Sequence, residues 1–142
     1  MADSVARLYD AVIAVRGTDP TKSRTARLLR SGRAKMAKKL AEEAVEVVID
    51  AMHGQTEAVV RESADLLYNL VVLWVHAGVH PDDVWAEMQR REKMFGIAEK
   101  LPKDMVPGVA RRKAASKVVS KVVSKVAPKV VSLEARRLPK RR

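Results

Sequence analysis

An almost uninterrupted apolar run, Asp65-Leu-Leu-Tyr-Asn-Leu-Val-Val-Leu-Trp-Val75, lies near the middle of this 142-residue chain. In a helix of this sequence, apolar side chains point in nearly every direction, so other helices have to surround it. We place the run in a long helix from about residue 55 to residue 77, which ends at Gly78. In so short a chain, we expect part of the covering surface to come from a second copy of the protein.

The neighbouring segments are also predicted to be helical, because their apolar residues recur three or four positions apart. The chain contains only two Trp, two Tyr and one Phe, and this scarcity of aromatic residues favours helix over strand. The sequence therefore predicts an all-α helical bundle of about four to five helices, completed by homodimerisation. The other expected helices are residues 4–16, 23–31 and 34–52, and one that opens at His80-Pro81.

Charge divides the chain into two parts. Up to Asp104 there are 16 Lys and Arg against 16 Asp and Glu, whereas from Met105 onward there are 12 basic residues and one acid, Glu134. We therefore expect a balanced domain over residues 1–104 and a basic tail over residues 105–142. The tail is of low complexity, since it repeats Lys-Val-Val-Ser, and we expect it to be disordered. The partner that such a tail predicts is nucleic acid, bound weakly and without sequence specificity.

Composition also excludes some kinds of site. The chain has no cysteine, so it has no disulfide, zinc-thiolate site or cysteine nucleophile. The N-terminus shows no basic segment followed by an apolar run, as a secretory signal would, and no apolar stretch approaches the ~20 residues that span a bilayer. We therefore expect a cytoplasmic protein that does not bind membranes.

Acidic residues are concentrated on two consecutive predicted helices. Glu42-Glu43-Ala-Val-Glu46 is followed, after 15 residues, by Glu62-Ser-Ala-Asp65. Helical spacing places the acids of each motif on one edge, so that antiparallel neighbours could turn the two edges toward each other. Facing carboxylates repel each other unless a cation lies between them, and oxygen ligands suit Mg²⁺ or Mn²⁺, which commonly bind phosphates. The pattern thus favours metal-dependent phosphate chemistry over an ordinary solvated acidic face.

Basic residues precede these acids. Arg24, Arg27 and Arg30 recur at helical spacing just upstream, and a polyanionic substrate would use such a patch for steering and positioning. A solvated basic face is the alternative interpretation. No Gly-x-x-x-x-Gly-Lys-Ser/Thr loop is present, which excludes a P-loop enzyme.

The two acidic motifs resemble the signature of the MazG-like all-α nucleoside triphosphate pyrophosphohydrolases, Glu-Glu-x-x-Glu followed by Glu-x-x-Asp. More narrowly, residues 38–46 and 62–70 resemble the phosphoribosyl-ATP pyrophosphatase family, and so do Ser23-Arg-Thr-Ala-Arg-Leu-Leu29 and Val84-Trp-Ala-Glu-Met88. The resemblance covers roughly residues 5–103. It implies a homodimeric helical enzyme that uses Mg²⁺ to hydrolyse phosphoribosyl-ATP to phosphoribosyl-AMP and pyrophosphate, the second step of histidine biosynthesis.

The resemblance also implies roles for individual residues. Glu43, Glu46, Glu62 and Asp65 correspond to metal ligands. Glu42 and Glu43 correspond to the catalytic acids, Glu42 being either a ligand or the base that orients the attacking water. Lys38 and Lys39 would contact phosphates, as would the upstream arginines, and Asn69 would contact the substrate.

Departures from the family pattern keep two other functions open. Asn69 stands where His is expected, and Arg24 stands where Tyr is common. These differences concern the substrate pocket, so a house-cleaning pyrophosphohydrolase that acts on dNTPs or NTPs is one alternative. A helical dimer that binds nucleic acid through its basic tail, without catalysis, is the other.

Overall fold

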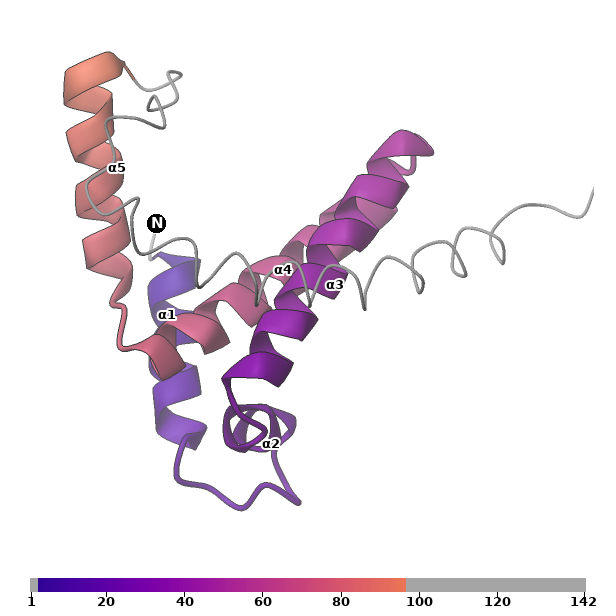
Figure 1. The fold of residues 1–142 in the computed structure, drawn as a ribbon, viewed down its shortest axis with the longest axis vertical. Helices are drawn as coiled ribbons and strands as arrows, with labels where there is room; N and C mark the ends of the chain where they lie inside the picture. The colour runs from indigo at the N-terminus through magenta and orange to yellow at the C-terminus, as the bar shows by residue number, and fades with distance from the viewer. Residues whose placement is uncertain (1–2, 97–142) are drawn as a thin grey trace, which may run out of the picture.

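The computed structural model describes residues 3–96, which form five α-helices and, within that range, no strand (Figure 1). This confirms the predicted all-α bundle. The boundary expected at residue 104 and the basic tail 105–142 lie outside the described residues. No described helix is both long and apolar enough to cross a membrane. The helices are α1 (Ser4–Val15), α2 (Arg24–Arg30), α3 (Arg33–Met52), α4 (Thr56–Ala77) and α5 (Pro81–Phe95).

Local sequence signals set the ends of these helices. The Asp3 carboxylate accepts a hydrogen bond from the backbone N–H of Val5 at the start of α1, and the Ser23 hydroxyl accepts one from Ala26 at the start of α2. His80 caps α5 as part of a capping box, as its position before Pro81 predicts. At the C-terminal end of α4, Gly78 adopts a left-handed conformation with φ of 71°.

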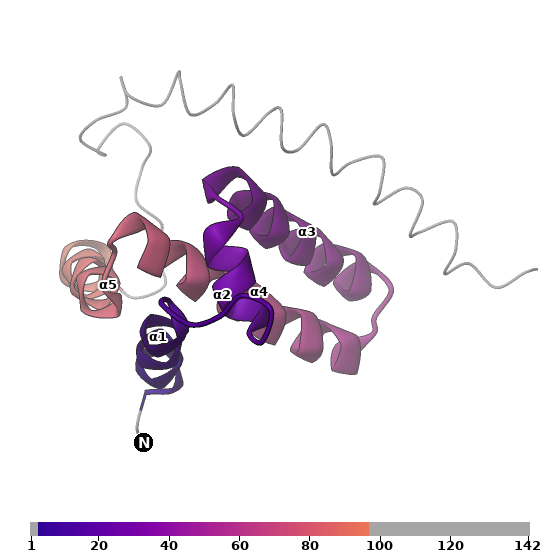
Figure 2. The same ribbon diagram turned by 90° about the horizontal axis from the view of Figure 1, so that it is seen from below.

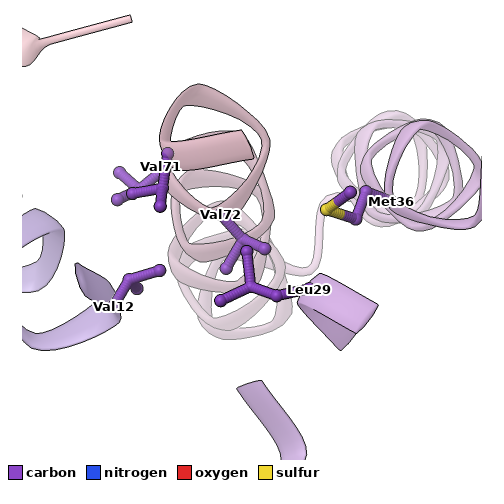
Figure 3. Packing of buried hydrophobic residues seen from close by; sticks show 6 residues of the cluster. Val12, Leu29, Met36, Val71 and Val72 are labelled. Atoms are coloured by element: carbon purple, nitrogen blue, oxygen red, sulfur yellow. The ribbon is translucent and has the colours of Figure 1, made fainter. Parts of the chain in front are cut away.

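The hydrophobic core forms around α4. Val71 and Val72 are fully buried, and they meet Val12 from α1, Leu29 from α2 and Met36 from α3 (Figure 3). Because three other helices each send a side chain to α4, it is the element on which the domain is built.

One expectation about α4 is only partly met within the described chain. Its apolar run was expected to be enclosed on all sides, but Leu67 is 47% exposed, while Val75, two turns on, is buried. The reason is that α1, α2 and α3 cover only part of the circumference of α4 in a single copy (Figure 2).

Helices α3 and α4 form an antiparallel hairpin and lie side by side from the turn that joins them, while the C-terminal end of α4 extends beyond α3 toward α1 (Figures 1 and 2). Gly54, with φ of 68°, makes the sharp turn between them. This pairing places the acidic edge of α3 against the acidic edge of α4, and so it positions the candidate site.

Helix α5 lies beside α1 and away from α3 (Figures 1 and 2). Aromatic contacts attach it: Trp74 and Trp85 meet edge to face at 6.5 Å, and Tyr9 meets His80 at 5.0 Å. The Trp85 indole N–H also donates to the Asp3 carboxylate at 3.1 Å. These contacts fasten α5 to α1 and to the last turn of α4.

Candidate active site

Three carboxylates from the hairpin converge. Glu43 comes from α3, and Glu62 and Asp65 come from α4; each offers an oxygen, and these oxygens all lie within 4.8 Å of one another. Glu62 and Asp65 share one edge of α4 because they are three positions apart, and the hairpin brings Glu43 opposite them. Glu43 and Glu62 are half-buried, and Asp65 is exposed. Three carboxylates that could hold a metal ion thus lie in one place, and one of them is open to solvent.

The crowding of these acids changes the ionisation of Glu43. Burial raises the pKa of the Glu43 carboxyl above its usual value, Lys39 opposes that rise, and the charges of Asp65, Glu62 and Glu42 add to it. A bound cation would relieve both the burial cost and the repulsion. The ligand set contains only oxygens, which fits Mg²⁺ or Mn²⁺ and disfavours zinc.

Glu42 lies between two lysines on α3. Its carboxylate oxygens are 3.4 Å from the Lys38 ammonium and 3.4 Å from the Lys39 ammonium. Lys39 also lies 4.0 Å from a carboxylate oxygen of Glu43. Both lysines are at least 38% exposed, and ion pairs of such groups are weak, so a phosphate can replace a carboxylate as their partner.

A pocket of about 560 Å³ opens between the acids and α2. Glu43 and Asp65 supply negative charge to its lining, and four basic side chains supply positive charge. A site of this kind can hold a divalent cation and the phosphates that the cation binds at the same time. The lining residues are Arg24, Arg27, Leu28, Lys35, Lys39, Glu43, Asp65, Tyr68 and Asn69.

Two of the lining side chains are held in place by backbone carbonyls. The Arg27 guanidinium donates to the carbonyls of Pro20 at 3.1 Å and Thr21 at 3.4 Å. The Asn69 side-chain amide, which is 5% exposed, donates to the Asp65 carbonyl at 2.9 Å. Both side chains are therefore oriented before any ligand arrives.

The structure brings together most, but not all, of the residues predicted from the sequence. Among the predicted metal ligands, the converging group contains Glu43, Glu62 and Asp65 but not Glu46, which is half-buried one turn further along α3. Glu42 is also outside this group of three. The ligand role of Glu46 and the catalytic role of Glu42 therefore stay predictions.

Only some of the predicted phosphate-binding residues line the pocket. Arg24, Arg27 and Lys39 line the pocket, as does the predicted substrate contact Asn69, whereas Lys38 and Arg30 are not among its lining residues. Arg30 instead lies near Asp19, where it adds slightly to the lowering of the Asp19 pKa that two hydrogen bonds from Thr21 cause.

Three pocket residues were not singled out as site residues from the sequence. Lys35 lies four residues before Lys39 and eight before Glu43, so it follows the same ridge of α3, and this spacing could have identified it. Tyr68 lies three residues after Asp65 on α4, but its place inside an apolar run concealed it. Leu28 had no signal beyond its apolar character.

Comparisons with known proteins agree on one family. The family model described as phosphoribosyl-ATP pyrophosphohydrolase matches residues 5–92. Phosphoribosyl-ATP pyrophosphatase 2 of Rhodopseudomonas palustris is 70% identical over 106 residues, which cover 75% of this chain and 81% of that protein. Phosphoribosyl-ATP pyrophosphatase 2 of Bradyrhizobium diazoefficiens is 60% identical over 143 positions, or 99% of each chain.

The phosphoribosyl-ATP pyrophosphatase of Gluconobacter oxydans is 56% identical over 94 residues, which are 66% of this chain and 71% of that protein. No solved structure matches the chain significantly. The family match covers α1 to α4 and most of α5, and it includes every carboxylate of the converging group. The chain belongs to the phosphoribosyl-ATP pyrophosphohydrolase family.

Proposed function

We propose that this protein hydrolyses phosphoribosyl-ATP to phosphoribosyl-AMP and pyrophosphate in the cytoplasm, as the second step of histidine biosynthesis. The observation that carries the proposal is the pocket itself, in which Glu43 and Asp65 face the basic side chains of α2 and α3. The acidic edge suits a divalent cation, and the basic edge opposite suits the phosphates that this cation binds. Membership of the family supplies the nucleotide that bears the polyphosphate.

The metal we propose is Mg²⁺, with Mn²⁺ as a substitute. Glu43, Glu62 and Asp65 would hold it, together with Glu46 as the predicted fourth ligand. When bound, such a cation neutralises phosphate oxygens and lowers the cost of charge that develops on them. This ligand set suits it because three oxygens are already within reach of one ion.

The side chains of this chain position the reactants. Arg24 and Arg27 from α2, with Lys39 from α3, bind the phosphate oxygens. Lys38 and Arg30 stay predicted phosphate contacts, and Asn69 is the proposed substrate contact. Glu42, next to the metal-binding acids, orients the attacking water and takes its proton. The oxygen of that water bonds to the α-phosphorus, the bond from the α-phosphorus to the α–β bridging oxygen breaks, and pyrophosphate leaves.

A substrate comparison tests this proposal. Pyrophosphate release is measured with Mg²⁺ present for phosphoribosyl-ATP and, separately, for the four common dNTPs. We expect kcat/KM to be highest for phosphoribosyl-ATP. Higher values for a dNTP would favour a house-cleaning pyrophosphohydrolase, and absence of turnover on every nucleotide would favour the nucleic-acid-binding alternative.

Glu46→Gln tests the ligand assignment in the same assay. This change keeps the size of the side chain and removes one charge. We expect a loss in kcat of about 100-fold or more, since electrostatic groups at such a centre contribute on that order. Activity equal to that of the parent would remove Glu46 from the ligand set.

We also infer that the protein is a homodimer that pairs through the α3–α4 hairpin. Each helix of the hairpin exposes apolar side chains: Val48 and Met52 on α3 are 59% and 81% exposed, and Val60 and Leu67 on α4 are 65% and 47% exposed. The spacing is four residues on α3 and seven on α4, so each pair forms a stripe. A second copy of the same hairpin would cover both stripes at once.

A further inference from the structure

A hydroxyl–hydroxyl hydrogen bond connects the two walls of the pocket. The Thr25 hydroxyl on α2 and the Tyr68 phenol on α4 lie 2.7 Å apart and are partly buried, although 43 positions separate them in sequence. Tyr68 lines the pocket, and Thr25 stands next to Arg24, which does so too. The bond therefore joins α2, whose Arg24 and Arg27 we call the basic wall of the pocket, to α4, which carries Glu62 and Asp65.

Helix α2 needs such a connection because it is short. It has seven residues, and its buried residues are Ala26 and Leu29, which lie three positions apart on one side. Leu28 also packs partly against the core. Apolar contacts are non-directional, so they resist a roll of so short a helix less than a hydrogen bond does, and a roll would displace the long side chain of Arg24. Thr25 is bonded to α4 beside these apolar residues, so it resists that motion.

We propose that the Thr25–Tyr68 pair is a positioning element that fixes the distance between the basic wall and the metal-binding acids. This inference rests on the proposed function, because that distance matters when one polyphosphate must reach both. Misplacing a binding group by about 1 Å can cost on the order of 100-fold in rate. Thr25 and Tyr68 act through Arg24 and Arg27 in this scheme, and neither has to touch the reacting atoms.

The proposal predicts a specific pattern of kinetic changes. Phosphate contacts from α2 are made in the ground state and in the transition state alike, so their misplacement raises KM more than it lowers kcat. We expect Tyr68→Phe and Thr25→Val each to raise KM about 5- to 10-fold, the range for loss of one neutral hydrogen bond. Since both changes break the same bond, the double variant should be no worse than either single one.

The experiment measures KM for four variants and for a fifth that restores the hydroxyl at position 25. Tyr68→Phe, Thr25→Val and the double variant are compared with Tyr9→Phe, which removes a phenol oxygen from α1 at a position that does not line the pocket. Thr25→Ser keeps the hydroxyl and should restore a KM within about 2-fold of the parent. Because Thr25→Val and Thr25→Ser change the same position, this pair carries the test even if Tyr68→Phe does not fold.

Binding of pyrophosphate, measured by calorimetry with Mg²⁺ present, gives a readout that does not depend on turnover. We expect weaker pyrophosphate binding in Tyr68→Phe and Thr25→Val and parental binding in Tyr9→Phe. The proposal would be overturned if the increases in KM of the two single variants multiplied in the double variant. It would also be overturned if Tyr68→Phe and Thr25→Val lowered the Tm but kept the parental KM and pyrophosphate affinity. A parent that binds pyrophosphate but turns over no nucleotide would contradict the proposed function, while the binding comparison would still decide the role of the pair.

Discussion

Glu43 is the residue at which the electrostatics of the site are concentrated. Its side chain is 14% exposed, and it faces Glu62 and Asp65 across the hairpin. Within the described residues, Lys39 is the one cation among the groups that shift its pKa. Crowded carboxylates without a metal ion oppose folding, because they repel each other and are partly removed from water. The consequence is that stability and metal binding should respond in opposite ways to removal of this charge.

Glu43→Gln should therefore stabilise the metal-free protein at neutral pH. The pKa of Glu43 is raised above 4.5 in the folded state, so between 4.5 and the raised value the folded state binds more protons than the unfolded state. The free energy of unfolding contributed by this group consequently falls as pH rises through that window, and the penalty persists above it. Urea unfolding in EDTA should show a gain for the variant at pH 7 that disappears below 4.5.

The same variant should lose activity. With one proposed metal ligand and one charge removed, we expect kcat with Mg²⁺ to fall by about 100-fold or more. Glu92→Gln on α5, which is exposed and distant from the pocket, is the matched control and should match the parent in both assays. A variant that lost stability in EDTA at pH 7 would show that Glu43 is held by favourable contacts instead.

Lys39→Met gives a complementary prediction. Lys39 lowers the pKa of Glu43, so its removal should raise that pKa further. Because a protonated Glu43 binds a cation poorly, the acidic limb of the pH profile of kcat/KM should move to higher pH. KM should also rise about 10-fold, because the change removes a proposed phosphate contact. Lys93→Met on α5 serves as the control. If the acidic limb of Lys39→Met stayed at its parental position, Lys39 would have no effect on the ionisation of Glu43.

Spacings of three and four residues on two consecutive helices predicted that two acidic edges would face each other, and Glu43, Glu62 and Asp65 do converge. The same spacings did not distinguish Glu43 from Glu42 and Glu46, which share its edge but lie outside the converging group.

Tyr68 was not predicted, since its function depends on a hydroxyl of α2 that is 43 positions away, and helical periodicity carries no information about such a contact. Lys38 and Lys39 illustrate the same limit: only Lys39 lines the pocket, although the two are adjacent in sequence.

Among the helices, the end of α4 offers a clean test of how local geometry contributes to stability. Gly78 has φ of 71°, and a Cβ added there would meet nothing within 4 Å. Gly78→Ala would therefore be destabilising through backbone strain alone, by about 1–2 kcal/mol. Chemical unfolding measures this cost. Gly17→Ala is the control, because Gly17 also has open space but no positive φ, and it should be neutral or slightly stabilising.

Helix ends were predictable from the sequence, whereas the position of α5 was not. The expected helix over residues 34–52 appears as Arg33–Met52, and the one expected over residues 55–77 appears as Thr56–Ala77. Caps and breakers such as Ser23 and Gly78 act locally, which explains this agreement. The position of α5 beside α1 depends instead on Trp85 meeting Asp3, 82 positions away, and no local signal encodes it.

For the whole molecule, the exposed stripes of the hairpin predict how copies associate. Val60→Asp places a charge on the α4 stripe, and a buried unpaired charge is costly, so we expect the dimer to dissociate. Sedimentation equilibrium would detect a change to the monomer mass. Met94→Asp on α5 is a matched control, since Met94 is 57% exposed but lies outside the hairpin. A dimer that survives Val60→Asp and dissociates with Met94→Asp would move the interface to α5.

Basic charge is concentrated in the C-terminal tail, residues 105–142. Residues 1–104 are balanced in charge, and all but one of the ionised residues beyond them are basic. Removing residues 105–142 should therefore leave turnover within about 2-fold of the full chain, since the pocket lies between α2, α3 and α4. Binding of duplex DNA should be lost, because attraction of lysines to phosphates is independent of sequence and needs only charge.

Fluorescence anisotropy with a labelled duplex at increasing salt measures this contact. For the full chain, log Kobs should fall linearly with log salt, because bound lysines release counterions from the duplex. The tail has no aromatic residue to stack on bases, so affinity should not depend on DNA sequence. If the truncated protein bound DNA as tightly as the full chain, Arg24 and its basic neighbours at the pocket would become the source of the attraction, and pyrophosphate would then compete with DNA for them.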